Sequence, residues 1–143
     1  MMISTKGRYA LRVMIDLAEH DAGSYIPLKE VAQRQHISEK YLESIIKLLV
    51  HSGDLEGVRG KGGGYRLTKA PDQYRVGDIL RLTEGGLAPV ACLEDQAKEC
   101  PYTAECRTLP LWKELDQLVQ DYLDSKTIAD LMLPAQQGDD YVI

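Results

Sequence analysis

The chain has 143 residues, of which 44% are hydrophobic and 27% are charged, a composition typical of globular proteins and unlike that of disordered or fibrous chains. It contains no apolar run of about 18 residues, the length that a membrane-spanning helix requires, and its first residues become charged too early for a secretory signal. We therefore expect a cytoplasmic protein with one compact core and a helical extension, and no membrane partner.

Charge is distributed unevenly along the chain, whose net charge is −5. Residues 1–75 carry 12 Lys and Arg against 9 Asp and Glu, whereas residues 76–143 carry 5 against 13. A basic half joined to an acidic half is typical of a nucleic-acid-binding unit whose sensing or oligomerising part lies elsewhere.

The first half of the chain has the apolar periodicity of three helices. The first helix covers residues 5–20, and Pro27 begins a second, short helix. The Ser38 hydroxyl is a suitable N-cap for a third helix that runs to about His51. That helix buries an apolar stripe made of Leu42, Ile45, Ile46 and Leu49. It exposes a polar face made of Glu39, Lys40, Glu43, Ser44 and Lys47. Two short helices joined by a tight turn after a longer helix predict a helix-turn-helix, and a three-helix bundle is the alternative.

The segment after the third helix favours the helix-turn-helix over the bundle. Strand-like residues 55–58 and 65–68 flank a loop that contains four glycines together with Arg59 and Lys61. A β-hairpin in this position is a wing. Its glycine-rich tip can enter the narrow minor groove of DNA, where the negative potential attracts arginine.

A phosphate-binding loop is the competing interpretation of these glycines, and residue identity excludes it. A P-loop requires Ser or Thr after its Gly-Lys pair, whereas Gly62 follows Lys61 here. The dinucleotide-binding fingerprint requires a third glycine where this chain has Tyr65.

The second half of the chain predicts a short helix, a loop and a long helix. Residues 76–84 are amphipathic and end at a glycine pair, whereas residues 87–107 show no periodicity and contain every cysteine. The long helix begins near Thr108, and Thr127 with Asp130 forms a capping box for a last helical turn. The apolar stripe of the long helix consists of Leu111, Trp112, Leu115, Leu118, Val119 and Tyr122.

Three segments, in this order, resemble the Rrf-type bacterial winged-helix regulators. They are residues 4–11 (STKGRYAL), 38–43 (SEKYLE) and 59–65 (RGKGGGY), and the likeness continues through residues 76–79 and the long helix to Leu131. The family includes the iron–sulfur cluster regulator IscR, the nitric-oxide sensor NsrR and the cysteine-metabolism repressor CymR.

The resemblance implies a homodimeric transcription factor that represses or activates promoters. Its long helix would cross between subunits, so that the two recognition helices lie about 34 Å apart on a near-palindromic operator of double-stranded DNA. The implied fold is mainly α with a small β-hairpin wing, a winged helix-turn-helix plus a long dimerisation helix. We expect a DNA-binding domain over residues 1–75, a sensor loop and dimerisation helices over residues 76–134, and a flexible tail over residues 135–143.

The resemblance also assigns DNA-contacting residues to the first helix, the start of the recognition helix and the wing. Glu43 matches a glutamate that influences which class of site IscR binds, and a carboxylate there can accept a hydrogen bond from a cytosine amino group; a solvated surface charge is the alternative. Tyr9 either contacts a backbone phosphate or packs in the core. The predicted DNA-binding residues are Tyr9, Ser38, Glu39, Lys40, Tyr41, Glu43, Ser44, Lys47, Arg59 and Lys61.

Cys92, Cys100 and Cys106 are separated by seven and then five residues. Soft thiolates that cluster in one loop suit zinc or an iron–sulfur cluster, and the close two-residue spacing of structural zinc sites is absent. The sensing branches of the family hold a 2Fe–2S or 4Fe–4S cluster through three such cysteines. A redox-switched disulfide, a thiol sensor without a cluster as in CymR, and inert thiols are the alternatives.

The fourth ligand of such a cluster is unassigned, because the chain departs from both sensing branches. Leu109 stands where the cluster-assembly branch has a histidine, and Arg8 stands where the nitric-oxide branch has an aspartate. Glu99, Glu105 and a small exogenous ligand are the candidates.

Two other classes of protein compete with a DNA-binding regulator. An enzyme is disfavoured because no Ser-His-Asp or Cys-His constellation is suggested, and His20, His36 and His51 all fall at predicted helix ends. A winged helix that binds only proteins is the second rival. Steep salt dependence of DNA binding distinguishes the regulator from it.

Overall fold

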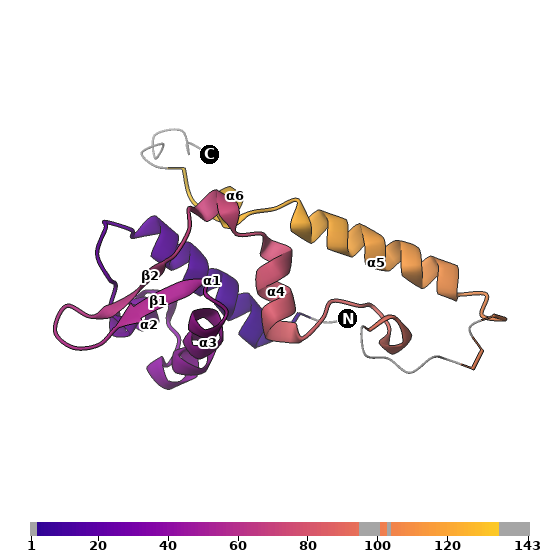
Figure 1. Cartoon of the computed structure of the whole chain (residues 1–143), viewed down its shortest axis with the longest axis horizontal. Coiled ribbons are helices and arrows are strands. Elements are labelled where there is room, and N and C mark those ends of the chain that lie inside the picture. Colours follow the sequence, from indigo (N-terminus) through magenta and orange to yellow (C-terminus); the bar gives the residue numbers. More distant parts are fainter. Residues whose placement is uncertain (1–2, 95–100, 103, 135–143) are drawn as a thin grey trace.

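The structure is a computed structural model that describes residues 3–94, 101–102 and 104–134. It is mainly helical with one small antiparallel sheet, which confirms the expected fold class (Figure 1). The elements, in chain order, are α1 (Thr5–Glu19), α2 (Leu28–Gln35), α3 (Glu39–His51), β1 (Leu55–Val58), β2 (Gly64–Leu67), η1 (Pro71–Gln73), α4 (Val76–Glu84), η2 (Ala91–Leu93), α5 (Leu109–Asp124) and α6 (Ile128–Leu131).

Side-chain caps fix the starts of three helices. The Ser38 hydroxyl accepts a hydrogen bond from the backbone N–H of Tyr41 at the start of α3, as the sequence predicts. Thr127 and Asp130 form both hydrogen bonds of a capping box at α6, and the Ser4 hydroxyl caps α1. The sequence predicts Pro27 in the first turn of α2, whereas in the structure it is the N-cap residue just before that turn.

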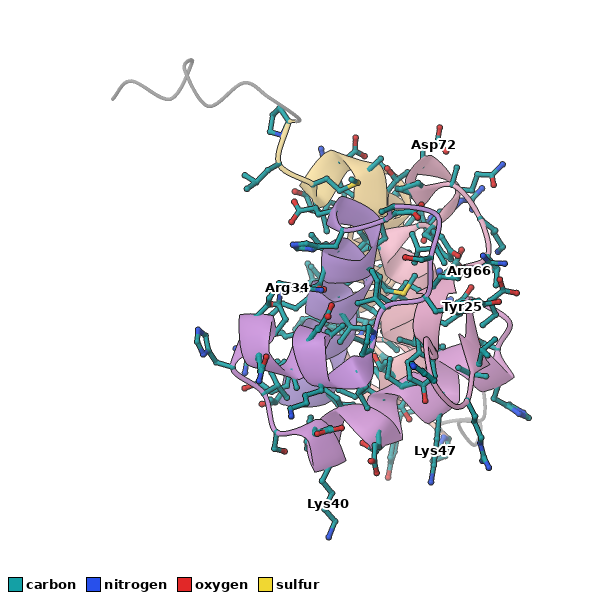
Figure 2. The ribbon with its side chains drawn as sticks, turned by 90° about the vertical axis from the view of Figure 1, so that its left-hand side faces the viewer. Tyr25, Arg34, Lys40, Lys47, Arg66 and Asp72 are labelled. Atoms are coloured by element: carbon teal, nitrogen blue, oxygen red, sulfur yellow. The ribbon has the colours of Figure 1, made fainter. Side chains whose placement is uncertain are left out.

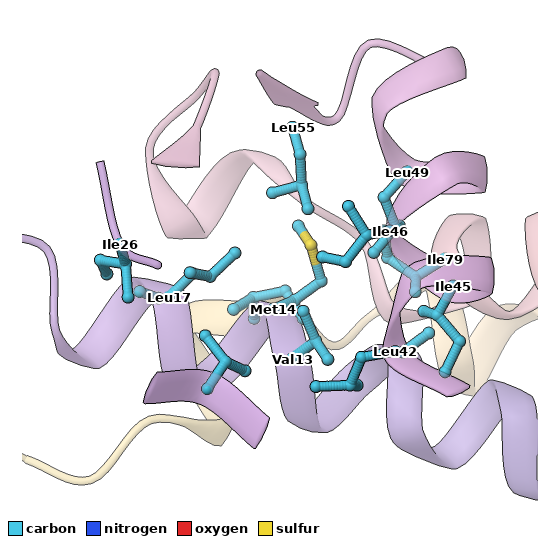
Figure 3. Close-up of a cluster of buried hydrophobic side chains, with 14 of the residues drawn as sticks. Val13, Met14, Leu17, Ile26, Leu42, Ile45, Ile46, Leu49, Leu55 and Ile79 are labelled. Atoms are coloured by element: carbon cyan, nitrogen blue, oxygen red, sulfur yellow. The ribbon is translucent and has the colours of Figure 1, made fainter. Parts of the chain in front are cut away.

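One hydrophobic core joins α1, α3, the hairpin and the later helices (Figure 3). Met14 on α1 lies at its centre among side chains of α3 and β1. Ile79 of α4 and Ile128 of α6 belong to the same core and are 1% and 0% exposed. The core therefore continues past residue 75, and the expected division of the chain at that residue stays a prediction.

The turn between α2 and α3 is set by one residue in a left-handed conformation. His36 has φ +55°, the only positive φ of a non-glycine residue in the described part of the chain. The Ile37 N–H then donates to the Ala32 carbonyl at 3.1 Å. This hydrogen bond gives a partner to a carbonyl group at the end of α2, and the turn sets the direction of α3. A non-glycine residue adopts the left-handed conformation at a conformational cost.

The hairpin is held along β2 by a bridge to Ile26, and its tip is free. Leu55 pairs with Leu67 and Val58 with Gly64, so β2 begins one residue earlier than predicted. Ile26 and Tyr65 exchange two backbone hydrogen bonds of 2.9 and 2.8 Å. The four tip residues 59–62 are exposed, so the tip of the wing stands clear of its own chain.

Helix α5 extends away from the compact remainder of the molecule (Figure 1). None of its residues is fully buried. Arg81 of α4 connects it to the core by donating to Gln120 at 3.0 Å and to Asp124 at 2.7 Å. Within the described ranges, no helix is both long enough and apolar enough to span a membrane.

Candidate nucleic-acid interface

The polar face of α3 presents two lysines on one side of the molecule. Lys40 and Lys47 are seven residues apart, about two helical turns, and both side chains point away from α1 (Figure 2). Leu42, Ile45, Ile46 and Leu49 are buried on the opposite face, as the sequence predicts. Packing of that apolar stripe therefore fixes which way the two lysines point.

The side chains of all four predicted DNA-contacting cations have no partner within the described part of the chain, in contrast to several arginines elsewhere. The side chains of these residues form no ion pair or hydrogen bond there; the residues are Lys40, Lys47, Arg59 and Lys61. By contrast, Arg34 donates to the buried Asp16 carboxylate at 2.8 and 3.0 Å, and this bond raises the arginine pKa. Unpaired exposed cations remain available for an external anion such as DNA phosphate.

The wing tip adopts conformations that only glycine tolerates at low cost. Gly60 and Gly62 have φ +94° and +76°, and a Cβ atom at Gly63 would collide with the Val58 carbonyl. The tight turn leaves Arg59 and Lys61 exposed on either side of Gly60. The glycines therefore give a narrow tip that carries two free positive charges.

A groove of about 410 Å³ separates α3 from the hairpin and brings Lys47 and Arg59 together. Its other lining residues are Ile46, Val50, His51, Gly57, Val58 and Tyr65. Residues predicted from two separate motifs thus converge on one surface. His51 and Val58 were not predicted site residues, although His51 follows Lys47 by one helical turn on the same helix.

The predicted contact Tyr9 lies between the core and the start of α3. Its half-buried ring packs against the core and meets the Tyr41 ring edge-to-face, with centroids 5.7 Å apart. The Arg12 guanidinium lies 5.0 Å from the Tyr9 ring centroid and donates to the Gln35 side chain at 3.1 Å and to the Gln35 carbonyl. Arg12, which sequence reasoning missed, therefore links the end of α2 to the start of the predicted recognition helix.

The remaining predicted residues of α3 are exposed at its amino-terminal half. Ser38, Glu39, Glu43 and Ser44 all face solvent, and the Ser44 hydroxyl donates to the Tyr41 carbonyl at 2.8 Å. Glu43 lies between the two lysines in sequence. Its carboxylate has no ion pair among the described residues. Its predicted role in DNA-site selection stays a prediction.

Two of the three cysteines fall within the described residues. Cys92 is exposed in η2, and Cys106 is half-buried just before α5. The side-chain hydroxyl and backbone N–H of Thr108 hydrogen-bond to the Cys106 sulfur and lower its pKa. Cys100 and Glu99 lie outside the described residues, as does the predicted tail 135–143. Within the part of the chain that is described, no group of three His, Cys, Asp or Glu side chains is placed to hold a metal.

The apolar stripe of α5 lies on the surface of the single chain. Leu118 and Tyr122 are 69% and 62% exposed, and Leu111 and Leu115 are also exposed. Trp112 and Val119 are half-buried. An apolar stripe of this kind is typical of a helix that packs against another protein surface.

Comparison with known proteins relates the whole described chain to transcriptional regulators. The Rrf2 family model, described as an iron-dependent transcriptional regulator, matches residues 3–134. The chain is 40% identical over 131 residues to the regulator CymR of Bacillus subtilis, covering 92% of this chain and 89% of CymR. It is 37% identical over 133 residues to the regulator IscR of Erwinia tasmaniensis, covering 92% and 79%. The solved structure of CymR, the global cysteine regulator of B. subtilis, superposes with a TM-score of 0.74 at 41% identity, covering 92% of this chain and 95% of that one.

Proposed function

We propose that this chain, which belongs to the Rrf2 family of transcriptional regulators, binds double-stranded DNA sequence-specifically through α3 and the hairpin. The family consists of transcriptional regulators and not enzymes. The observation that carries the proposal is the convergence of unpaired cations: Lys47 and Arg59 line one groove, and Lys40 projects from the same side of α3 as Lys47. The start of α3 would contact base edges and the wing would enter the adjacent minor groove.

The DNA-binding proposal is tested with a duplex selected by the wild-type protein from a random library. We expect Lys40→Ala and Arg59→Ala each to weaken binding of that duplex, by about 1–3 kcal/mol for a contact to a base and less for a phosphate contact. Lys113→Ala on the polar side of α5 removes the same charge far from α3 and serves as the matched control. Wild-type affinity in both Lys40→Ala and Arg59→Ala would overturn the assignment.

We further propose that the protein acts as a homodimer through the apolar stripe of α5. The exposed Leu111, Leu115, Leu118 and Tyr122 support this, because an apolar stripe on a projecting helix is stabilised when another apolar surface covers it. A two-fold dimer would present two copies of α3 to a near-palindromic operator, with half-sites about 34 Å apart.

The cysteine segment is the proposed sensor. The thiols of Cys92, Cys100 and Cys106 would hold an iron–sulfur cluster, and the soft donor set of three thiolates fits such a group. When bound, the cluster would supply chemistry that responds to oxidants, nitric oxide or iron supply. The similarity to IscR supports this proposal, and the similarity to CymR supports the alternative of thiol or partner control without a cluster.

Anaerobic purification distinguishes the two sensing proposals. With a cluster, the protein is brown, contains iron and sulfide, and loses its visible absorption in Cys92→Ala and in Cys106→Ala, whereas Leu93→Ala in the same segment keeps it. A colourless wild-type protein in which all three thiols titrate as free would exclude the cluster and favour thiol control.

A further inference from the structure

We propose that Arg81 determines which spacing between half-sites the dimer accepts on DNA, by fixing the direction of α5 relative to the part of the chain that carries α3. This inference rests on the proposed dimer and its DNA-binding function. It assigns a positioning residue that lies outside both the α5 stripe and the DNA-contacting surface. We call Arg81, Gln120 and Asp124 together the Arg81 clamp.

The backbone attachment of α5 to the rest of the chain lies at its carboxyl-terminal end. Just beyond the helix, the Val76 N–H donates to the Lys126 carbonyl at 2.9 Å, and the Ile128 N–H donates to the Tyr74 carbonyl at 3.0 Å. Leu123 packs on a small apolar cluster to which α4 contributes. These contacts hold one end of α5, and the remainder of the helix projects from the molecule (Figure 1).

The Arg81 clamp is a second point of attachment, and two points fix the direction of a rod. The guanidinium donates to the Gln120 side-chain carbonyl from Nε at 3.0 Å and from Nη2 at 2.6 Å. Nη2 also donates to the Asp124 carboxylate at 2.7 Å. Asp78, one turn earlier on α4, accepts a hydrogen bond from Nη1 at 3.0 Å and orients the group. The planar guanidinium with these bonds leaves α5 little freedom to swing.

Close packing does not fill the angle between α4 and α5 in place of the clamp. A cavity of about 590 Å³ lies between α4, η2 and α5, beside Arg81 and Gln120. Glu84, Glu94 and Asp116 also line it. Because interlocking side chains usually set the angle between two helices, the hydrogen bonds of the clamp take over that role here.

Gly77 allows α4 to approach α5 closely enough for the clamp to form. A Cβ atom at Gly77 would collide with Oδ1 of Asp124. That oxygen is buried and has no hydrogen-bond partner among the described residues. The bond from Arg81 to the other carboxylate oxygen therefore holds Asp124 in place, and Gly77 and Arg81 act on the same point of α5.

Helix α4 is in turn held to α1. Glu84 accepts hydrogen bonds from the Ser4 N–H at 3.0 Å and from the Ser4 hydroxyl at 2.7 Å. Gly7 of α1 lies so close that a Cβ atom there would collide with the Glu84 carboxylate. Ile79 of α4 shares the main core with α1 and α3. The position of α4 relative to the predicted recognition helix is therefore fixed, and the clamp passes this position on to α5.

In a two-fold dimer the direction of α5 decides how far apart the two copies of α3 lie. Helix α5 has 16 residues, and a rotation of about 10° at one end of a rod of about 24 Å moves its other end by about 4 Å. This displacement is close to the rise of one base pair, about 3.4 Å. Gln120 and Asp124 each lie two residues from Leu118 or Tyr122, hence on a different face of the helix. The clamp can therefore hold α5 while a partner covers its stripe.

The test measures affinity for duplexes that carry two copies of the selected half-site at different spacings. Wild type should bind its best spacing about tenfold more tightly than spacings one base pair longer or shorter, because a wrong spacing requires the DNA to bend or twist. In Arg81→Met this preference should fall to about threefold or less, while affinity for a duplex with one half-site stays at the wild-type value. Loss of stability alone would weaken binding of every duplex alike.

Arg75→Met is the matched control. Arg75 is an exposed arginine just before α4, and its side chain forms no ion pair or hydrogen bond within the described residues. Gly77→Ala tests the clamp without removing its charge. The added methyl group displaces the Asp124 carboxylate and should reduce the spacing preference as Arg81→Met does.

An unchanged spacing preference in Arg81→Met and Gly77→Ala would overturn the role of the clamp, as would a wild type that binds all spacings equally. Equal weakening on every duplex, including the single half-site, would assign Arg81 to stability and overturn it as well. Each of these results leaves the proposed function standing. If the wild type is a monomer or selects no duplex, the proposed function itself fails, and the inference fails with it.

Discussion

Helices α3 and α5 are both amphipathic, yet they differ in where their apolar faces find a partner. On α3, Leu42 and Ile45 are completely buried within the chain, and the opposite face offers unpaired lysines. On α5 no residue is buried, and Leu118 is 69% exposed. Periodicity predicts that a helix has an apolar face, but it does not say whether that face is covered by the same chain. Helix α3 therefore buries its apolar face in the core of its own chain and exposes a charged surface. Helix α5 exposes an apolar surface that another chain can cover.

The largest effect should come from placing charge on the apolar face of α5. The double substitution Leu115→Asp and Leu118→Asp should convert a dimer into a monomer, because two carboxylates cannot be buried unpaired between helices. Light scattering after size-exclusion chromatography measures the mass, and circular dichroism should show an unchanged helix content. Lys113→Asp on the polar side of α5 should remain dimeric. A wild-type mass of one chain would contradict the proposed α5 interface.

Truncating one leucine on α3 and one on α5 compares an apolar face that is buried within the chain with one that is exposed. Leu42→Ala should lower the free energy of unfolding by about 2–5 kcal/mol, because it opens a cavity in a fully buried site. Leu118→Ala should destabilise the protein only through the dimer, so its effect in urea unfolding should vanish on dilution. Equal, concentration-independent losses in the two variants would mean that α5 is covered within its own chain.

Removing the Tyr74 hydroxyl should lower stability by a smaller amount, and this hydroxyl bonds backbone groups at both ends of the wing. Its buried hydroxyl donates to the Asp54 carbonyl at 2.7 Å, before β1, and accepts from the Thr68 and Lys69 N–H groups at 2.9 and 3.0 Å, after β2. Tyr74→Phe removes the acceptor of the Thr68 and Lys69 N–H groups, while the Asp54 carbonyl keeps the hydrogen bond from the Thr68 hydroxyl at 3.4 Å, and should cost about 1–3 kcal/mol in unfolding experiments.

The DNA affinity of the same variant tests whether Tyr74 positions the wing. Tyr74→Phe should weaken DNA binding when Arg59 is present and have little further effect in Arg59→Ala, which a double-mutant cycle detects. Tyr25→Phe, whose hydroxyl lies 3.5 Å from Glu56, is the control. Additive losses of affinity would show that Tyr74 contributes only to stability.

The smallest effect concerns the capping box of α6. Hydrogen bonds from the backbone and hydroxyl of Thr127 lower the pKa of Asp130 below its ordinary value of 3.8. Because the folded-state pKa is depressed, the stabilisation is present above pH 3.8 and is lost as pH falls through the lower folded-state value. The stability difference between wild type and Asp130→Asn should therefore shrink in strong acid. A difference that is constant with pH would show that the carboxylate charge plays no part.

Local signals in the sequence located the α-helices and the hairpin to within about one residue, but they did not predict the short turns η1 and η2. Ser38 and Thr127 are caps because a hydroxyl satisfies backbone N–H groups a few residues away, and such short-range chemistry can be recognised without a structure. The glycine-rich hairpin and the apolar stripe of α5 can also be recognised from residues that are close together in the sequence.

Contacts between separate elements could not be predicted from these signals. Arg12 contacts Gln35 on another helix, and Arg81 joins Asp124 across 43 residues of sequence. His51 and Arg59 line one groove only because the hairpin folds back beside α3. The left-handed conformation of His36 depends on how α2 and α3 pack on α1, since no glycine marks the turn. Tertiary packing decides all of these features.

The most direct test of the DNA-binding surface is the salt dependence of binding to the selected duplex, in wild type and in the double variant Lys40→Ala and Arg59→Ala. We predict that the wild-type binding constant falls with salt along a log–log slope of several units. The double variant should have a slope smaller by about two, one for each phosphate that its missing cations no longer neutralise. An unchanged slope together with unchanged affinity would show that α3 and the hairpin do not hold the DNA.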